Sequence, residues 1–201
     1  MAKILSFLLL FAGSAALAAD NAGTVLALKG DCIADPAGAH LALKIGDPVA
    51  VGQTIETGDG AKLKLQMVDG SVISAGSNSR ITIQSYGKDA SGGRDVALAL
   101  ASGLLRAVVA PAAQPSRFEV STATGVAAVR STDWFAEAKA DGTTIVGVLQ
   151  GKVALAGRKT KAAVLIPERQ GARVSAGTDP TAPRPWSDAE FADVIGRTDL
   201  P

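Results

Sequence analysis

The stretch from Ala61 to Ile83 constrains the fold of this chain more than any other feature. It reads AKLKLQMVDGSVISAGSNSRITI, with apolar and polar residues alternating on both sides of Asp69-Gly70. A period of two places alternate side chains on opposite faces of a strand, and Asp-Gly between two such runs is the strongest short-range signal for a tight β-hairpin. The same rhythm recurs along most of the chain, so the sequence predicts an all-β body.

Further short strands are expected where apolar and β-branched residues stand between turn signals. They cover Thr24–Lys29, Leu41–Leu43, Thr54–Thr57, Ile81–Ile83, Val96–Ala101, Leu104–Val109, Phe118–Ser121, Val126–Val129, Trp134–Ala138, Thr144–Leu149, Lys152–Leu155, Ala162–Ile166 and Ala172–Val174. Tyr86–Arg94 is expected to be the most flexible loop. No segment of helical period interrupts these strands, which disfavours βαβ units. We therefore expect a β-sandwich or jelly-roll-like body of many short strands.

The first residues indicate export. Lys3 gives a positive start, Ile4–Phe11 is an apolar run, and Ala16–Ala18 forms an A-x-A cleavage site. These features are typical of a secretory signal peptide, here residues 1–18. The apolar run is shorter than the roughly 18 residues of a membrane span, so an uncleaved anchor is the weaker alternative. We expect the trimmed chain in the periplasm, with no stable membrane span.

The charge balance of the chain argues against nucleic acid as a partner. The chain has 20 Lys+Arg and 19 Asp+Glu, whereas binding to phosphates needs a basic surplus on one surface. Aromatic residues make up only 4%, so the core must be assembled from many small aliphatic contacts. Cys32 is the single cysteine, which excludes an internal disulfide, and its apolar neighbours predict a buried thiol on a strand.

The tail differs from the body. Gly177–Pro185 is rich in proline and is typical of an extended linker. After it, Ser187 and Glu190 have the spacing of a capping box, and Trp186 and Phe191 have that of a hydrophobic staple. The sequence therefore predicts a short amphipathic helix at the C-terminal end.

This helix is expected to end at Gly196 and is too short to be stable by itself in water. We expect it to dock through Trp186 and Phe191, in the simpler case on its own body and otherwise on a partner. The chain is accordingly divided into a signal peptide at 1–18, a β domain at 19–177 and a linker with a short helix at 178–201.

No residues in the chain have the spacing of a catalytic, metal or cofactor site. His40 is the only histidine, and no cysteine stands near it, so a zinc site is not expected. No serine lies in a G-x-S-x-G elbow, and there is no G-x-x-x-x-G-K-[ST] loop. Most acids beside Gly or Pro are explained by turns. Asp133, next to Trp134, is the one carboxylate that could hold a sugar.

The residues that could contact a partner are aromatic or basic. Arg130 can pair with an acid or bind an anion, and residues 158–161 form a basic hairpin tip. The candidate partner-binding residues are Trp134, Arg130, Arg158, Lys159, Lys161, Trp186 and Phe191. The acids of the tail could be attracted to the basic tip, although exposed charge pairs contribute little.

A series of short motifs, in order along most of residues 23–177, resembles the FecR domain. Leu65–Ser71 is similar to the family's L-x-x-x-D-G-S hairpin, and Val148–Val153 is similar to its V-x-x-G-x-V segment. Phe118–Thr122 followed by Val129–Thr132 is similar to its F-x-V-x-T and V-R-G-T segments. The other pieces are Gly23–Val25, Gly46-Asp47, Val51–Gln53, Ile55–Gly58, Ser77–Ile81, Gly103–Leu105 and Gln170-Gly171. Each is weak alone, but their order and spacing are specific.

The resemblance implies a FecR-like β-sandwich and a role in envelope signal transduction. Well-known members lie in the periplasm and relay a signal from an outer-membrane receptor to a cytoplasmic sigma factor, which requires a cytoplasmic segment and a spanning helix. We expect neither here, so the sigma-regulating role is not carried over. At one position the chain departs from the family, which usually has Gly where Ser131 stands; a positive φ there would cost serine about 1 kcal/mol.

The leading hypothesis is a stand-alone, non-enzymatic periplasmic module for protein interaction or sensing, which binds an envelope protein through exposed strand edges. The alternative is a carbohydrate- or peptidoglycan-binding module that uses Trp134 and the basic tip to hold cell-wall polysaccharide. An enzyme acting on polysaccharides is the weakest hypothesis, because turns explain most of the acids. No cofactor is expected in any of the three cases.

Overall fold

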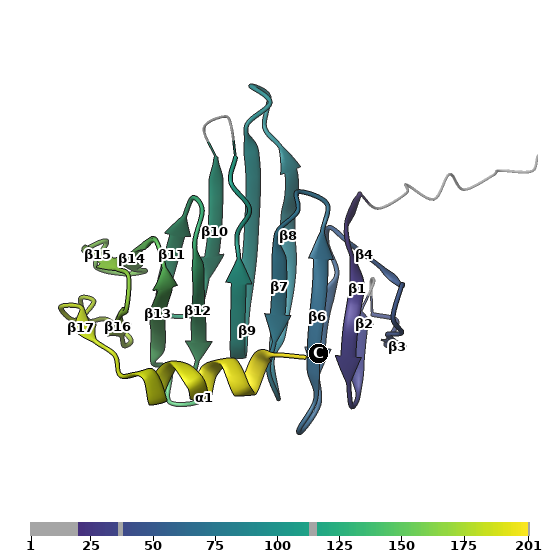
Figure 1. The fold of residues 1–201 in the computed structure, drawn as a ribbon. Coiled ribbons are helices and arrows are strands. Elements are labelled where there is room, and N and C mark those ends of the chain that lie inside the picture. Colours follow the sequence, from purple (N-terminus) through teal and green to yellow (C-terminus); the bar gives the residue numbers. More distant parts are fainter. Residues whose placement is uncertain (1–19, 36–37, 113–115, 201) are drawn as a thin grey trace, which may run out of the picture.

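The computed structural model describes residues 20–35, 38–112 and 116–200, so the predicted signal peptide lies outside the described residues. Within these ranges the chain forms 17 strands and one C-terminal helix, α1 (Asp188–Thr198) (Figure 1). The predicted all-β fold with a short terminal helix is confirmed. The strands form two sheets, named here sheet A and sheet B, and the main hydrophobic core lies between them.

Sheet A carries the helix. Its strands, in pairing order, are β4 (Pro48–Ala50), β1 (Asn21–Lys29), β6 (Lys62–Met67), β7 (Val72–Ala75), the end of β9 (Arg94–Val108), β12 (Asp133–Ala138), β13 (Thr144–Gln150), β16 (Gln170–Val174) and β17 (Arg184–Pro185). All of these pairings are antiparallel. β6 and β7 form the hairpin predicted at Asp69-Gly70, where Gly70 has a φ of +86°. The Asp141-Gly142 turn joins β12 to β13 in the same way.

Sheet B forms the second layer. Its strands, in pairing order, are β3 (Leu41–Ala42), β2 (Cys32–Asp35), β5 (Thr54–Thr57), β8 (Arg80–Lys88), the beginning of β9, β10 (Arg117–Ser121), β11 (Gly125–Val129), β14 (Lys152–Gly157) and β15 (Ala163–Pro167). The pairing of β9 with β10 is parallel, and the others are antiparallel. The two sheets therefore share β9.

β9 is a single strand of 15 residues, where the sequence predicts two strands around Ser102-Gly103. Its residues up to Ser102 pair with β8 in sheet B, and those from Gly103 onward pair with β12 in sheet A. The change of sheet falls at Gly103, which has a φ of +83°. The Ser79 hydroxyl accepts a hydrogen bond from the Leu104 amide at 2.9 Å and donates one to the Gly76 carbonyl at 2.9 Å, so both of these backbone groups are paired at the corner.

Alternating residues divide the apolar side chains between two clusters. On β12, Trp134 faces the core between the sheets, whereas the next residue, Phe135, faces outward and packs under α1. Most of the core consists of Val, Leu, Ile and Ala, as the low aromatic content implies. The larger cluster lies between the two sheets, and the smaller one lies on the outer face of sheet A under α1.

The predicted flexible loop Tyr86–Arg94 is shorter than expected, since β8 runs to Lys88 and β9 begins at Arg94. The reason is burial of both ends: Tyr86 and Arg94 are 6% and 7% exposed. Tyr86 also packs edge-on against Phe118, with ring centroids 6.4 Å apart. The remaining turn, residues 89–93, is fixed by the Asp89 carboxylate, which accepts hydrogen bonds from backbone amides.

The helix α1 covers part of the outer face of sheet A. Figure 1 shows it running across the strands from the side of β17 toward β6, near which the chain ends. The Ser187 hydroxyl and the Glu190 carboxylate form the predicted capping box at its start. None of the helical residues in the described ranges forms a stretch long and apolar enough to cross a bilayer.

We expect Gly103→Ala to lower the free energy of unfolding by about 3 kcal/mol or more. An added Cβ would lie 2.5 Å from Ser79 Cα, and the positive φ disfavours any L side chain. Gly142→Ala is the matched control: its φ is +80°, but no atom lies within 4 Å of the added Cβ, so we expect a loss of only about 1 kcal/mol. Urea unfolding measures both; equal losses would contradict the steric part of the argument.

Candidate functional site

The described residues contain no cluster suited to catalysis by a metal. No group of three or more His, Cys, Asp or Glu side chains within these ranges could hold a metal ion, and His40 is exposed in a loop. Cys32 is the predicted buried thiol and donates a weak hydrogen bond to the Lys62 carbonyl at 3.6 Å. Burial, with a smaller contribution from Asp31, raises the pKa of this thiol to about 11, which makes it unreactive near neutral pH.

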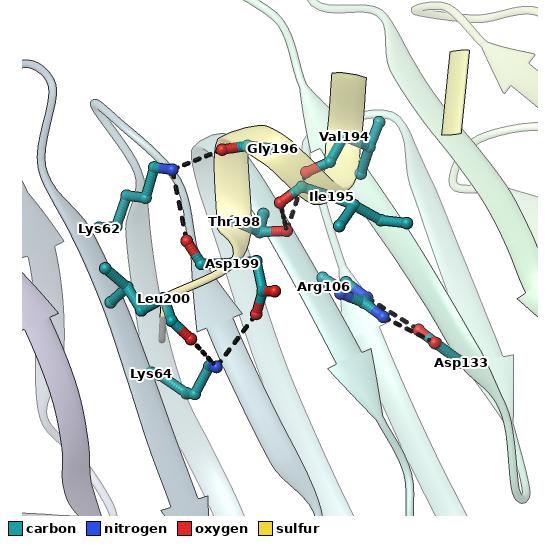
Figure 2. Close-up of polar contacts among 10 residues, drawn as sticks. All are labelled: Lys62, Lys64, Arg106, Asp133, Val194, Ile195, Gly196, Thr198, Asp199 and Leu200. Atoms are coloured by element: carbon teal, nitrogen blue, oxygen red, sulfur yellow. Dashed lines mark hydrogen bonds and ion pairs between the residues drawn. The ribbon is translucent and has the colours of Figure 1, made fainter. Parts of the chain in front are cut away.

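Trp134 is not available to a partner, so its assignment as a binding residue is wrong. Its side chain is 0% exposed because it faces the core between the sheets. Its neighbour Asp133 is also engaged, since the Arg106 guanidinium donates to both carboxylate oxygens at 3.0 and 2.8 Å (Figure 2). Trp134 and Asp133, the aromatic and carboxylate pair considered for sugar binding, therefore do not form a binding surface.

The tail residues Trp186 and Phe191 dock on the body of the protein itself. Phe191 is 2% exposed and packs with Val194 against Leu104 and Phe135. Trp186 stands between two rings, with its centroid 5.1 Å from that of Phe135 and 5.5 Å from that of Phe191. These contacts form the predicted staple and leave Phe191 unavailable to a partner.

The end of α1 is held by two lysines of β6, as Figure 2 shows. The Lys62 ammonium donates to the carbonyls of Gly196 and Asp199, and the Lys64 ammonium donates to the Asp199 carboxylate and to the Leu200 carbonyl. Cations are favourable at the C-terminus of a helix because its last carbonyls carry partial negative charge. Because these carbonyls are satisfied, the helix continues past Gly196 to Thr198, and the predicted stop at that glycine is wrong.

The acids of the tail pair with residues other than the basic tip at 158–161. Asp188 contacts Arg169, Asp193 contacts Arg197 and Asp199 contacts Lys64. Glu190 accepts from Arg184, and this hydrogen bond, together with one from the Ser187 amide, lowers the pKa of Glu190 to about 2. The tip itself is exposed, and none of its three basic residues forms an ion pair within the described ranges.

Within the described ranges, the outer face of sheet B is instead hollowed over β10, β11, β14 and β15. Register places Glu119 of β10 beside Ala128 of β11, then Ala154 of β14 and Leu165 of β15. The two alanines form a low floor between taller side chains, and the hollow above them has a volume of about 530 Å³. We call this hollow the trough; its defining residues are Glu119, Ala128, Arg130, Lys152, Ala154 and Leu165.

Arg130, one of the predicted binding residues, lies at one end of the trough with Lys152. Its carbonyl accepts a hydrogen bond of 2.5 Å from the buried Arg94, whose guanidinium also donates to the Ala110 carbonyl and the Ser116 hydroxyl. The backbone at this end of the trough is therefore tied to the interior of the protein.

Arg94 is in turn paired with Asp69 of the predicted hairpin turn, at 3.0 Å. The Asp69 carboxylate also accepts from the Tyr86 hydroxyl at 2.7 Å and from the Ser71 amide and hydroxyl, each at 2.9 Å. Partial burial acts to raise the pKa of Asp69, but these hydrogen bonds outweigh it and hold the pKa below its ordinary value of 3.8. This network connects the turn of sheet A to the trough of sheet B.

β15 is a free edge of sheet B, because within the described ranges it pairs only with β14. The Gly157 amide bonds to the Ala162 carbonyl at 2.9 Å, so by the alternation of an antiparallel ladder Val164 and Ile166 also bond toward β14. The backbone groups of Ala163 and Leu165 then point away from the sheet. Leu165 is 58% exposed, and Pro167, which has no amide hydrogen, limits the length of the edge.

Ser131 adopts no positive φ, since the non-glycine residues with positive φ in the described ranges are Asn78, Lys161 and Arg169. The strain considered for a Ser in place of Gly is therefore absent. Of the residues that define the trough, sequence reasoning proposed only Arg130 and missed Glu119, Ala128, Lys152, Ala154 and Leu165. The signal for the residues of β14 was a small or charged residue at every second position, but its meaning depends on which strands lie beside β14.

We expect Phe191→Ala to lower the free energy of unfolding by about 3 kcal/mol, because it removes a buried ring from the contact between α1 and sheet A. Ala192→Ser, one position away on the exposed side of the helix, should change it by about 0.5 kcal/mol or less. Urea unfolding compares the two, and equal stabilities would show that α1 does not contribute to the fold.

We expect Asp69→Asn to cost about 3 kcal/mol near neutral pH, because it leaves the Arg94 charge buried without its partner. The folded-state pKa of Asp69 lies below the unfolded value, so its contribution is present above about pH 4 and is lost as the pH falls through the folded-state pKa. The difference between wild type and variant should shrink in acid. A difference that stays constant with pH would contradict the role of the carboxylate.

Comparison with known proteins places this geometry in a family. The model of the FecR protein family matches residues 53–154, which run from β5 into β14 and include Asp69, Arg94 and Arg130. No curated protein sequence matches the chain. Two crystal structures of a candidate anti-sigma factor from Parabacteroides distasonis ATCC 8503 are similar, each with a TM-score of 0.58 and 13% identity over 69% of this chain. That likeness is one of fold, and the chain matches 62% of the length of that protein. Because the family model covers half of the sequence, this chain belongs to the FecR family.

Proposed function

We propose that this chain is a non-enzymatic recognition module of cell-envelope signalling that works in the periplasm, where it binds a protein partner through the open face and free edge of sheet B. The observation that carries the proposal is the difference between the two outer faces. Part of the outer face of sheet A is covered by the chain's own helix, whereas in the part of the chain that the structure describes sheet B has an open trough and, beside it, a strand paired on one side only.

Membership of the FecR family supports a signalling role, and the similar fold of a candidate anti-sigma factor agrees with it. The proposal covers recognition in the envelope and includes no contact with a sigma factor. The predicted signal peptide at 1–18 supports the periplasmic location. The acids singled out in the sequence are engaged in turns or ion pairs, as Asp69 and Asp133 illustrate, which supports a binding rather than a catalytic role.

A free edge offers a partner strand backbone hydrogen bonds, and an exposed side chain beside it supplies apolar contact. β15 provides both, through the outward-facing backbone of Ala163 and Leu165 and through the Leu165 side chain. The alternative of carbohydrate binding relied on Trp134, which is buried, so no specific observation now favours it.

The test is site-specific photocrosslinking in living cells, with the full chain carrying a benzophenone amino acid either at Leu165 or at Ala192. Both positions are exposed, but the second lies on the helix that covers sheet A. We expect one discrete crosslinked protein from position 165 and none from position 192, in the periplasmic fraction. No product at either position, or the same products at both, would overturn the proposal.

A further inference from the structure

We propose that the trough on sheet B binds an extended acidic peptide segment of the partner protein, with its carboxylates at the two ends of β14. This inference rests on the proposed function, because it names the chemistry of the partner. The trough comprises Glu119, Ala128, Arg130, Lys152, Ala154 and Leu165.

The shape of the trough fits one extended chain. Its floor consists of Ala128 and Ala154, which are neighbours in register on β11 and β14. Its walls rise on β10 and β15, which are three strand spacings apart, about 14 Å. An extended peptide lying along β14 can place alternate side chains on the alanine floor and contact the exposed Leu165 side chain.

Basic residues lie at the two ends of β14, one group of them in the trough and the other beyond it. Arg130 and Lys152 stand at one end, and neither forms an ion pair in the part of the chain that the structure describes. The basic tip at 158–161 follows the other end of β14, which is six residues long, or about 20 Å. Two basic groups at this separation are complementary to a strand that carries one acid near each end.

Few acids lie near the trough, and most of them already accept a hydrogen bond from the protein. Glu119 accepts from Arg117 at 3.1 Å, and Glu168 accepts from the Gly151 amide at 3.3 Å. At the other end, Thr178 lies against Gly157, so Asp179 is the one tail acid in that neighbourhood, against three cations of the tip. The tip therefore keeps a positive excess. At the other end Arg117 is shared by Asp95 and Glu119, so the charges there balance, and Arg130 and Lys152 are the cations without an ion pair within the described ranges.

The observations favour a peptide over a sugar polymer. Sugars commonly stack on exposed aromatic rings, but the aromatic residue that lines the trough, Phe118, is 1% exposed and belongs to the core. The free backbone edge of β15 points away from the trough, so it is open to another strand of the same partner and not to the peptide segment in the trough.

The experiment measures binding of an end-blocked fluorescent peptide of about seven residues, one more than β14, with Glu at its first and last positions and Ser, Val and Ala between. Fluorescence anisotropy with the mature wild-type chain should give saturable binding. Replacing both Glu by Gln in the peptide should weaken binding about tenfold, and raising the salt concentration should weaken it further.

Variants of the protein locate the site. Arg130→Gln, Lys152→Gln and Arg158→Gln combined should cause the same loss of about tenfold as the neutral peptide. Lys29→Gln, Lys44→Gln and Lys139→Gln combined is the matched control, because it removes the same charge from exposed cations elsewhere and should leave binding unchanged.

Ala154→Leu fills the floor of the trough without a change of charge and should also weaken binding. Circular dichroism and thermal unfolding of each variant show whether a loss of binding follows from a loss of structure.

Each other outcome overturns the inference. The first is that the wild-type chain does not bind the Glu peptide, and the second is that it binds the Glu and Gln peptides equally well. The third is that the trough and control variants lose binding equally, which would indicate nonspecific electrostatic attraction. Co-sedimentation with purified cell wall that depends on Arg130, Lys152 and Arg158, without peptide binding, would assign the trough to an anionic glycan instead. Crosslinking from Leu165 without peptide binding would leave the proposed function standing, whereas peptide binding without crosslinking would contradict only that function.

Discussion

The whole structure depends on one strand belonging to two sheets. β9 pairs with β8 and β10 in sheet B through its first residues, and with β7 and β12 in sheet A through its last. This change of sheet is sterically allowed because Gly103 adopts a positive φ directly against Ser79. The Ser79 hydroxyl replaces the backbone hydrogen bonds that a regular ladder would have supplied. With this corner in place, alternate residues of both sheets can face one core.

The outer faces of the two sheets differ. Sheet A has apolar residues on its outer face, such as Phe135, and these are buried by α1. Around the trough, sheet B presents alanines and charged residues outward, which can remain exposed to water, and none of the described elements covers them. The tail therefore contributes to stability on one side, and the other side retains the surface and the edge that recognition requires.

Much of the local structure was predictable. The Asp69-Gly70 hairpin, the capping box at Ser187 and the buried Cys32 follow from short-range rules, because turns, caps and strand periodicity depend on residues close together in sequence. The candidate site was predictable only in part: Arg130 and the tip at 158–161 are exposed in the structure, whereas Trp134 and Phe191 are buried. Period-two alternation shows that two residues share a face, but not which of the two faces is covered.

An all-β body with glycine at its corners and a capped helix at its end follows from the order of residues alone, since each of these depends on local backbone preferences. That Ala128 of one strand lies beside Ala154 of another, and that Arg94 reaches both Asp69 and the backbone of Arg130, became known only from the folded chain. The physical reason is that strand order and the docking of the helix arise from contacts between residues far apart in sequence. No local pattern records those contacts.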